Sequence, residues 1–305
     1  MSIDYRSINI LENLDFFATQ VVEGFITGLH KSPFHGFSVE FAEHRIYNPG
    51  ESIKNIDWKL FARTDKMFTK RFEEETNLRC HLVVDCSSSM FFPYNNDSSI
   101  DKLTFSILSS ACLMNLFKRQ RDAFGISLFS KSLDFHKKPK VSKKHYFQLM
   151  YELEKKLKQK KNLNILTNFS DSISNLVDLI NERSLIIIFS DFQGSRKKIN
   201  KLFQSLLNLK YKKHEIILFH VCDFKKEKKL DYKRGFYKFV DLETSSEIEI
   251  NPIDIKQQYQ KEIEKSIDYI KEKSAQLKMD YFIADLNKGF ERMLKAYLIK
   301  RSRLY

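Results

Sequence analysis

His81-Leu82-Val83-Val84-Asp85-Cys86-Ser87-Ser88-Ser89 is the stretch of this chain from which both a fold and a site can be predicted. The apolar run that ends at Val84 is typical of a buried strand, and the aspartate and alternating serines after it are typical of a loop that presents oxygen ligands. Hard divalent cations bind such oxygens. Because serine and aspartate also form ordinary turns and helix N-caps, a metal site requires further ligands elsewhere in the chain.

Strand-like and helix-like segments alternate on both sides of this stretch. Near-continuous apolar runs such as residues 184–189 are typical of strands that are covered on both faces. The alternation predicts an α/β fold with a doubly wound, mostly parallel sheet. Strands are expected at residues 78–84, 123–129, 184–189, 215–221 and 280–284, and helices at 101–116, 144–158, 195–209, 253–277 and 287–300, with a further helix around Leu176 and Leu179. Residues 224–250 are charged and irregular, with local alternation that predicts an extra hairpin.

The first quarter of the chain has a different pattern. Apolar residues at helical spacing predict an amphipathic helix over residues 7–29, whereas residues 35–75 show the alternation of a small β-rich module. The single tryptophan, Trp58, is expected to anchor the core of that module. The predicted domains are therefore residues 1–77, the helix with the β-rich module, and residues 78–305, the α/β domain.

Two aspartates are expected to meet at one edge of the sheet. Ligands of doubly wound sheets bind outside the carboxyl ends of the strands, near the point where the strand order reverses. Asp85 and Asp191 each follow a strongly apolar run, so both carboxylates should converge there beside Ser87 and Ser89. Thr167, which lies in a polar loop between the two strands, is a candidate for a further hydroxyl ligand. These oxygens suit the octahedral preference of Mg²⁺, although each of these side chains could instead cap a helix.

Two sets of residues resemble known families. The pattern Asp85-x-Ser87-x-Ser89 with Thr167 and Asp191 looks like the metal-ion-dependent adhesion site of von Willebrand factor A domains. An upstream block resembles the signature of the bacterial family known as domain of unknown function 58: Gly36-x-Ser38-x-Glu40-Phe41-x-Glu43-x-Arg45-x-Tyr47, Pro49-Gly50, Ile56-Asp57-Trp58-Lys59 and Ala62-Arg63. This resemblance implies a von Willebrand factor A-like domain that works with a MoxR-type AAA+ ATPase.

Composition excludes several classes of protein. Hydrophobic residues make up 42% of the 305 residues, which supports a sizeable core. The four cysteines are scattered and predict neither a disulfide framework nor a zinc site, and Cys86 is expected to be a packed thiol rather than a nucleophile. No segment approaches the roughly 20 apolar residues of a membrane-spanning helix, and no P-loop is present. A cytoplasmic location is the expectation.

The net charge does not identify the class of binding partner. The net charge of +13 comes from dispersed lysine runs, such as residues 155–161 and 225–229. Such runs are more often solvated faces than a nucleic-acid footprint, and they are also compatible with an acidic protein partner or with contact to a membrane surface.

The function expected from the pattern and the resemblance is non-enzymatic. A cation, Mg²⁺ with Mn²⁺ or Ca²⁺ as alternatives, would accept a carboxylate from a partner protein, and the module would act as an adaptor for the AAA+ ATPase. A metal-dependent hydrolase that uses the same ion is an alternative, but the chain offers no convincing general base. Nucleic-acid binding through the lysine runs is a second alternative.

Overall fold

The computed structural model describes residues 13–30, 44–46, 58–70, 78–93, 100–159, 163 and 169–302. It divides the chain into two compact units, Met1–Phe25 with Leu78–Tyr305, and Ile26–Asn77. Each unit is described by itself below.

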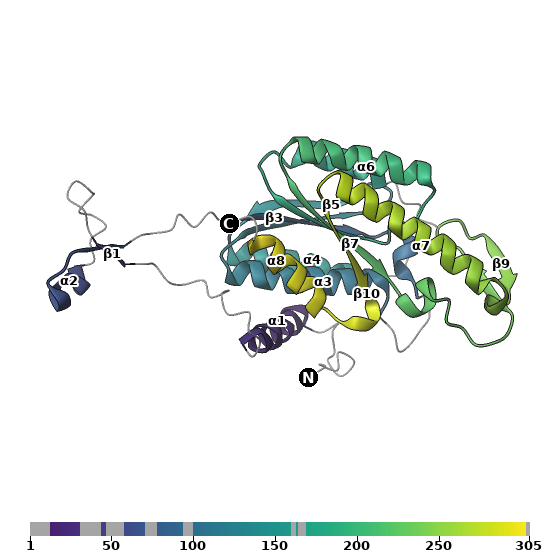
Figure 1. Ribbon diagram of the computed structural model, residues 1–305, viewed down its shortest axis with the longest axis horizontal. Coiled ribbons are helices and arrows are strands. Elements are labelled where there is room, and N and C mark those ends of the chain that lie inside the picture. Colours follow the sequence, from purple (N-terminus) through teal and green to yellow (C-terminus); the bar gives the residue numbers. More distant parts are fainter. Residues whose placement is uncertain are drawn as a thin grey trace. The chain divides into compact units, whose positions relative to one another are not determined.

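A six-stranded sheet forms the centre of the larger unit (Figure 1). All neighbouring strands are parallel except β5, which pairs antiparallel with β4 at one edge. The sheet confirms the predicted doubly wound, mostly parallel α/β class. In spatial order the strands are β10 (Asp280–Asp285), β7 (Glu215–Cys222), β6 (Leu185–Ser190), β3 (Arg79–Asp85), β4 (Ala123–Phe129) and β5 (Leu133–Lys140).

The strand order places a switch point between β3 and β6. The chain moves from β3 outward to β4 and β5, then returns to β6 on the other side of β3 and continues outward to β7 and β10. In parallel sheets of this type, ligands bind at the carboxyl ends of the two strands on either side of this point. Val84 lies opposite Phe189 in the register of the pair, so the loops that follow β3 and β6 leave the sheet side by side.

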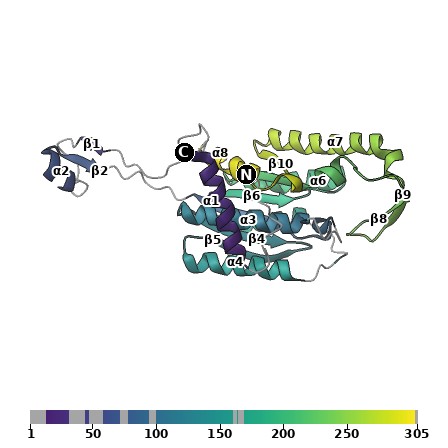
Figure 2. The same cartoon turned by 90° about the horizontal axis from the view of Figure 1, so that it is seen from below.

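Helices cover both faces of the sheet (Figures 1 and 2). The helices α5 (Phe169–Leu179), α6 (Arg196–Tyr211) and α7 (Pro252–Gln276) lie on one face, and α3 (Lys102–Arg119), α4 (Lys143–Lys158) and α8 (Glu291–Ser302) lie on the other. Apolar residues of α5 and α6, among them Ile173, Leu176 and Leu206, pack against Ile186 and Ile188 of β6. Burial of β6 on both faces explains why its sequence is continuously apolar.

Helix α1 (Leu14–His30) contributes its first turns to the larger unit. The Asn115 side chain of α3 donates a hydrogen bond to the hydroxyl of Thr19 (3.0 Å), and Phe17 contacts Phe290 edge to face. The sequence-based division placed this helix with the β-rich module in residues 1–77, whereas the structure joins Met1–Phe25 to the α/β domain. The apolar stripe of the helix is buried there, which the periodicity of one helix cannot reveal.

Besides the end of α1, the described residues of the smaller unit form two short strands and a further helix. β1 (His44–Ile46) pairs antiparallel with β2 (Phe68–Lys70), and α2 (Trp58–Thr64) lies between them in sequence. The prediction that Trp58 anchors the core is wrong, because its side chain is 57% exposed and contacts Phe61 one turn later on the same helix. Most of the upstream block that resembles the family signature lies outside the described residues.

An insertion separates β7 from α7. It contains the single-turn helix η3 (Phe224–Lys228) and an antiparallel hairpin of β8 (Tyr237–Val240) and β9 (Glu247–Ile250), which confirms the hairpin predicted for residues 224–250. Two shorter helical turns are η2 (Ser88–Phe91) and η4 (Leu286–Lys288). Among the described residues, no helix is both long enough and apolar enough to cross a membrane.

Candidate metal site

The predicted aspartates lie at the switch point of the sheet. Asp85 is the last residue of β3, and Asp191 follows the last residue of the neighbouring strand β6. Both side chains are buried, and so is Ser87. The structure thus brings together four of the five predicted ligand residues, Asp85, Ser87, Ser89 and Asp191, while Thr167 lies outside the described residues and stays a prediction.

The Asp85 carboxylate organises the loop after β3. One of its oxygens accepts a hydrogen bond from the backbone N–H of Ser87 (3.0 Å), and the other accepts one from the hydroxyl of Ser190 (2.7 Å). The first bond turns the chain back on itself, so that the hydroxyls of Ser87 and Ser89 come within 3.2 Å of each other. Both partners of Asp85 are neutral, which leaves its negative charge without a directly bonded cation among these contacts.

Asp191 has a buried cation beside it. The Lys102 ammonium donates hydrogen bonds to Asp191 (2.7 Å) and to Glu227 (2.8 Å), and its side chain is fully buried. The side chain of Ser89 is also close enough to the Asp191 carboxylate to help lower its pKa. Lys102 is the first residue of α3, where the Asp101 side chain caps the helix by accepting a hydrogen bond from the backbone N–H of Thr104 (2.7 Å).

Sequence reasoning missed Lys102 and Glu227. The position of Lys102, directly after the predicted cap residue Asp101, could have indicated a site residue. A helix that begins at the carboxyl edge of the sheet has its first residues next to a site at that edge. The lysine-rich composition hides that signal, since Lys102 is one of 52 lysines and arginines. Glu227 lies in the charged insertion, from which no site residue was predicted.

The two aspartates have opposite pKa shifts. Burial and the nearby Asp191 carboxylate raise the pKa of Asp85 to about 7. Burial also acts to raise the pKa of Asp191, but the Lys102 ammonium and its hydrogen bond outweigh it, and the pKa lies below its usual value. A buried carboxylate whose ionisation is disfavoured in this way favours the binding of an additional cation.

The donor set suits a hard divalent cation. It consists of carboxylate and hydroxyl oxygens, which Mg²⁺ and Ca²⁺ prefer over nitrogen or sulfur. Within the described part of the chain, no group of three or more histidine, cysteine, aspartate or glutamate side chains is placed to hold a metal. A site here therefore depends on two carboxylates together with serine hydroxyls and water, as the sequence predicts.

A cavity of about 250 Å³ opens at this site. Asp85 and Asp191 line it together with aromatic residues of α5 and of the loop after β6. Lys198 and Lys201 of α6 and Glu243 of the β8–β9 hairpin complete the mouth. A neighbouring cavity of about 340 Å³ is also lined by Asp191, together with Glu227, His220 and residues of α7.

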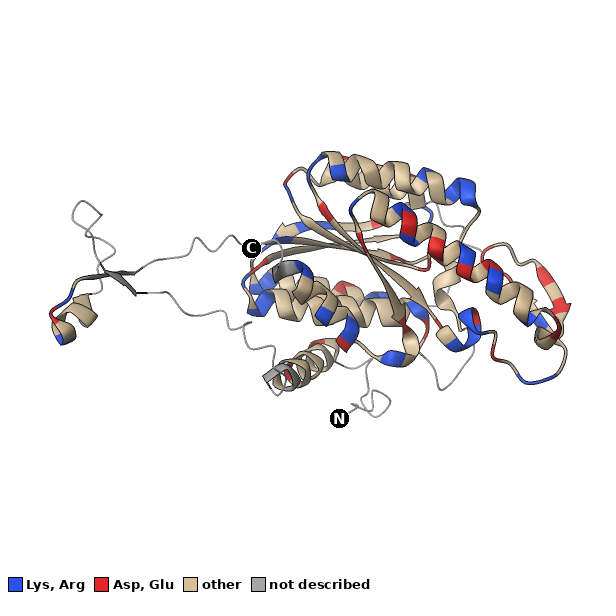
Figure 3. Cartoon of the chain, in the orientation of Figure 1, with Lys and Arg blue, Asp and Glu red and all other residues tan. Residues whose placement is uncertain are grey.

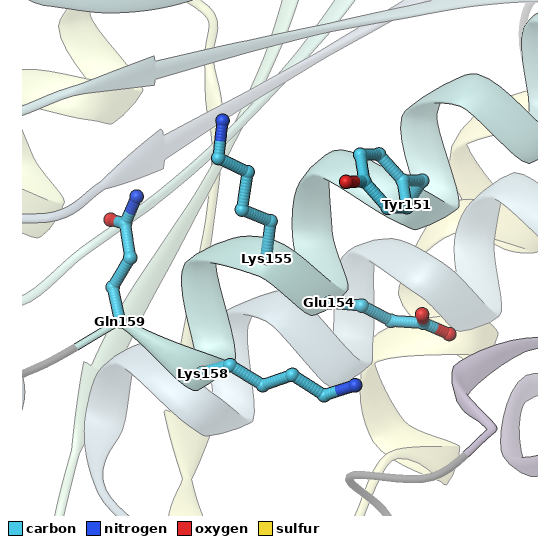
Figure 4. A pocket seen from close by; sticks show the side chains of 5 residues that line it. All are labelled: Tyr151, Glu154, Lys155, Lys158 and Gln159. Carbon is cyan, nitrogen blue, oxygen red and sulfur yellow. The ribbon is translucent and has the colours of Figure 1, made fainter.

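Another cavity, of about 430 Å³, lies over the last turns of α4 (Figure 4). Its lining side chains are Tyr151, Glu154, Lys155, Lys158 and Gln159. Glu154, the carboxylate in this lining, accepts a hydrogen bond from the backbone N–H of Leu14 (3.2 Å). With one carboxylate and two lysines, these side chains do not form a set of metal ligands.

Cys86 has the features of a structural residue. Its thiol is 2% exposed, and burial raises its pKa to about 12. A thiol of this kind is not a nucleophile at neutral pH, because the thiolate is the reactive form. The sulfur instead donates a weak hydrogen bond to the carbonyl of Val84 (3.7 Å).

Comparisons with known proteins give a family and two structural likenesses. The family model "Protein of unknown function DUF58" matches residues 43–269. The crystal structure of the conserved hypothetical protein BatB from Bacteroides thetaiotaomicron has a TM-score of 0.45 at 14% identity and covers 74% of this chain and 99% of its own. The SpRpn10 VWA domain has a TM-score of 0.33 at 11% identity and covers 48% of this chain and 76% of its own.

The curated relatives match a shorter stretch. The uncharacterized proteins Rv1480 of Mycobacterium tuberculosis and Mb1516 of Mycobacterium bovis are each 32% identical over 82 residues, 27% of this chain and 26% of the relative. The chain thus spans about a quarter of the length of these relatives. The family model, by contrast, matches well over half of the chain. The protein therefore belongs to the DUF58 family of proteins of unknown function.

Proposed function

We propose that this chain is a non-enzymatic, metal-dependent protein-interaction module of the cytoplasm. In this proposal the oxygens of Asp85, Ser87, Ser89 and Asp191 bind Mg²⁺, with Mn²⁺ or Ca²⁺ as alternatives, and Thr167 is the predicted fifth ligand residue. The observation that supports it most is the position of two buried carboxylates that line a cavity at the carboxyl edge of the sheet, with the hydroxyls of Ser87 and Ser89 3.2 Å apart in the loop after Asp85. A bound cation of this type offers a coordination position to a carboxylate oxygen of a partner.

The balance of charge in the site fits this proposal. Lys102 compensates one of the three carboxylates of Asp85, Asp191 and Glu227, and a divalent cation would compensate the other two. The metal-loaded site would then carry no excess negative charge to repel an incoming carboxylate. The side chains of Ser87 and Ser89 contribute oxygens without adding charge, which keeps the cation able to accept a charged ligand.

Basic residues around the cavity favour an acidic partner. Lys198 and Lys201 line its mouth, and Lys156 of α4 is close enough to Cys86, in the loop after β3, to act on it electrostatically. Positive charge at the rim of a cavity steers acidic ligands toward it. The proposed partner is therefore a protein that presents an aspartate or glutamate within an acidic segment.

The groups that the structure describes around the metal site favour a binding role over hydrolysis. Cys86 is a buried thiol, and His220, which lines the neighbouring cavity, hydrogen-bonds to the hydroxyl of Tyr281 (2.6 Å). Within the described residues, neither the lining of the metal cavity nor the contacts of Asp85 and Asp191 include a histidine that could serve as a general base. The partnership with a MoxR-type AAA+ ATPase is proposed from the family resemblance.

Titration calorimetry with Mg²⁺ tests the metal site. We expect the parent chain to bind Mg²⁺ and both Asp85→Asn and Ser89→Ala to bind it more weakly, with the larger loss in Asp85→Asn because a charged ligand is removed. Asp178→Asn, which removes an exposed carboxylate from α5, is the matched control and should bind as the parent does. Unchanged Mg²⁺ affinity in Asp85→Asn would show the assignment to be wrong.

A separate experiment tests the binding function. Immobilised parent chain is mixed with a purified MoxR-type ATPase in Mg²⁺ or in EDTA, and recovery should require both Mg²⁺ and an intact Asp85. No recovery under either condition would rule out this partner while leaving the metal site intact. Turnover of a phosphate or ester substrate that disappears in Asp85→Asn would instead establish the hydrolase, and affinity for DNA that falls steeply with salt would establish the nucleic-acid alternative.

A further inference from the structure

The β8–β9 hairpin extends to the mouth of the metal cavity. Glu243, in the turn between the two strands, lines the same cavity as Asp85 and Asp191. Lys198 and Lys201 of α6 line it as well, and Lys201 also pairs with Asp171 of α5 (2.9 Å), so the lining combines one acidic residue of the hairpin with two basic residues of the helix. Figure 3 shows the acidic residues of the hairpin and the basic residues of α6.

The turn that carries Glu243 has a defined conformation. The Asp241 side chain accepts hydrogen bonds from the backbone N–H groups of Glu243 (2.8 Å) and Thr244 (3.3 Å). The backbone N–H of Asp241 donates a hydrogen bond to the carbonyl of Ser246 (2.9 Å), which closes the turn. Ser245 adopts a left-handed conformation with φ of 58°. These bonds hold the main chain of the tip and so fix the position of the Glu243 backbone in the turn.

The tip also interacts electrostatically with α6. The pKa of Asp241 is below its usual value: burial acts to raise it, but the hydrogen bonds from Glu243 and Thr244 and the charge of Lys198 outweigh that effect. Lys198 therefore lies near both acidic residues of the turn, Asp241 through this interaction and Glu243 through the shared cavity. An acidic tip against a basic helix end is the arrangement that the proposed acidic partner would also adopt.

We propose that Glu243 is a built-in competitor for the carboxylate of the partner. The hairpin presents its own acidic side chain at the mouth of the metal cavity and so takes the place that an acidic segment of the partner must occupy. A partner binds only when it displaces this tip, which makes Glu243 a determinant of affinity and specificity. This inference rests on the proposed metal-dependent binding function.

The structure of the hairpin is compatible with displacement of its tip from the cavity. It is a two-stranded sheet separate from the central one, and isolated hairpins of this size are marginally stable. Its base is held by a hydrogen bond from Gln260 of α7 to the carbonyl of Lys229 (2.8 Å) and by Asn251, which caps α7. The tip can therefore move away from the cavity while the base stays attached to the domain.

Mn²⁺ and acetate provide a direct test. The full chain is loaded with Mn²⁺, and acetate, as the probe carboxylate, is titrated while water-proton relaxation reports the water bound to the metal. We expect acetate to displace water from Glu243→Gln at about a tenfold lower concentration than from the parent, because the internal carboxylate no longer competes. Glu249→Gln removes an exposed carboxylate from β9 of the same hairpin and should titrate as the parent does.

The outcomes separate the two proposals. Identical acetate titrations in the parent, Glu243→Gln and Glu249→Gln, with Mn²⁺ bound in all three, would overturn the role of Glu243 and leave the metal site standing. An equal effect of both substitutions would also overturn it, since the cause would then be the overall charge of the hairpin. If Mn²⁺ does not bind to the parent chain, the metal-dependent function itself is overturned, and the role of Glu243 with it.

Discussion

Asp85 and Asp191 lie at the carboxyl ends of neighbouring strands, but their electrostatic environments are opposite. Asp191 contacts the buried ammonium of Lys102, whereas the hydrogen bonds to Asp85 come from the backbone of Ser87 and the hydroxyl of Ser190. The pKa of Asp191 is accordingly lowered, and that of Asp85 is raised to about 7. The comparison shows that the fold places a cation, Lys102, beside Asp191 but, among the described residues, none in hydrogen-bond contact with Asp85. The half around Asp85 is where a bound metal ion would contribute most.

Removal of the internal cation should have the largest effect. Lys102→Met leaves the buried carboxylate of Asp191 and the partly buried carboxylate of Glu227 without their partner, and breaking a buried pair in this way costs about 3–5 kcal/mol of unfolding free energy. Urea denaturation in the absence of metal measures this loss. The double variant Lys102→Met/Glu227→Gln removes one of the stranded charges and should recover part of it. A loss below about 1 kcal/mol, typical of exposed pairs, would mean that the Lys102 cluster is hydrated.

A buried histidine away from the metal site provides a second case in which burial disfavours the charged form of a side chain. His81 of β3 is fully buried and shares Ser127 of β4 with His136 of β5, through hydrogen bonds of 2.8 and 2.9 Å. Burial, and the nearby His136 and His214, lower its pKa from 6.5 to about 3. In this pH range the unfolded chain binds the proton more readily than the folded one, so acidification below pH 6.5 destabilises the fold until the pH reaches about 3.

The variant His81→Gln isolates this effect. Its unfolding free energy should fall less than that of the parent between pH 6.5 and 4, with a difference of up to about 3 kcal/mol, because the uncharged amide takes up no proton. Urea denaturation across the pH series measures the difference. Parallel curves for the two chains would show that His81 is protonated in the folded state without cost.

Asp85→Asn should separate stability from metal binding. In the metal-free protein at neutral pH, we expect the variant to be no less stable than the parent, because the substitution removes a charge whose ionisation burial disfavours in the folded state. Mg²⁺, which should stabilise the parent by mass action, should stabilise the variant less at the same concentration. Thermal unfolding with and without Mg²⁺ measures both effects. A metal-free variant several kcal/mol less stable than the parent would show that the Asp85 charge is compensated by the protein itself.

An exposed ion pair should contribute least to the unfolding free energy. Lys201 and Asp171 form a pair at 2.9 Å, but both side chains are more than half exposed. Lys201→Met should change the unfolding free energy by less than about 0.5 kcal/mol, because solvent screens the pair and side-chain entropy opposes it. The same denaturation experiment applies. A change as large as that of Lys102→Met would contradict the distinction between buried and exposed charges on which the site assignment depends.

Much of the fold follows from patterns that are local in sequence. The apolar runs of β3, β6 and β7 are long enough to identify as buried strands, and their alternation with helices implies a parallel sheet. Asp85 and Asp191 could be chosen because each directly follows such a run. Strand β5 does not follow from such a pattern, since an edge strand rich in lysine lacks the apolar run of a buried one.

The sequence by itself determined the class of fold and the chemical type of the candidate ligands, because strand periodicity and a carboxylate after a strand are properties of neighbouring residues. Only the tertiary structure decided which charges meet. Lys102, Glu227 and Glu243 lie far from Asp191 along the chain and reach the site through a helix start, a single turn and a hairpin tip. A lysine that neutralises a buried carboxylate is identical in sequence to one in solvent, and the free energy that distinguishes them arises only when packing removes water from both groups.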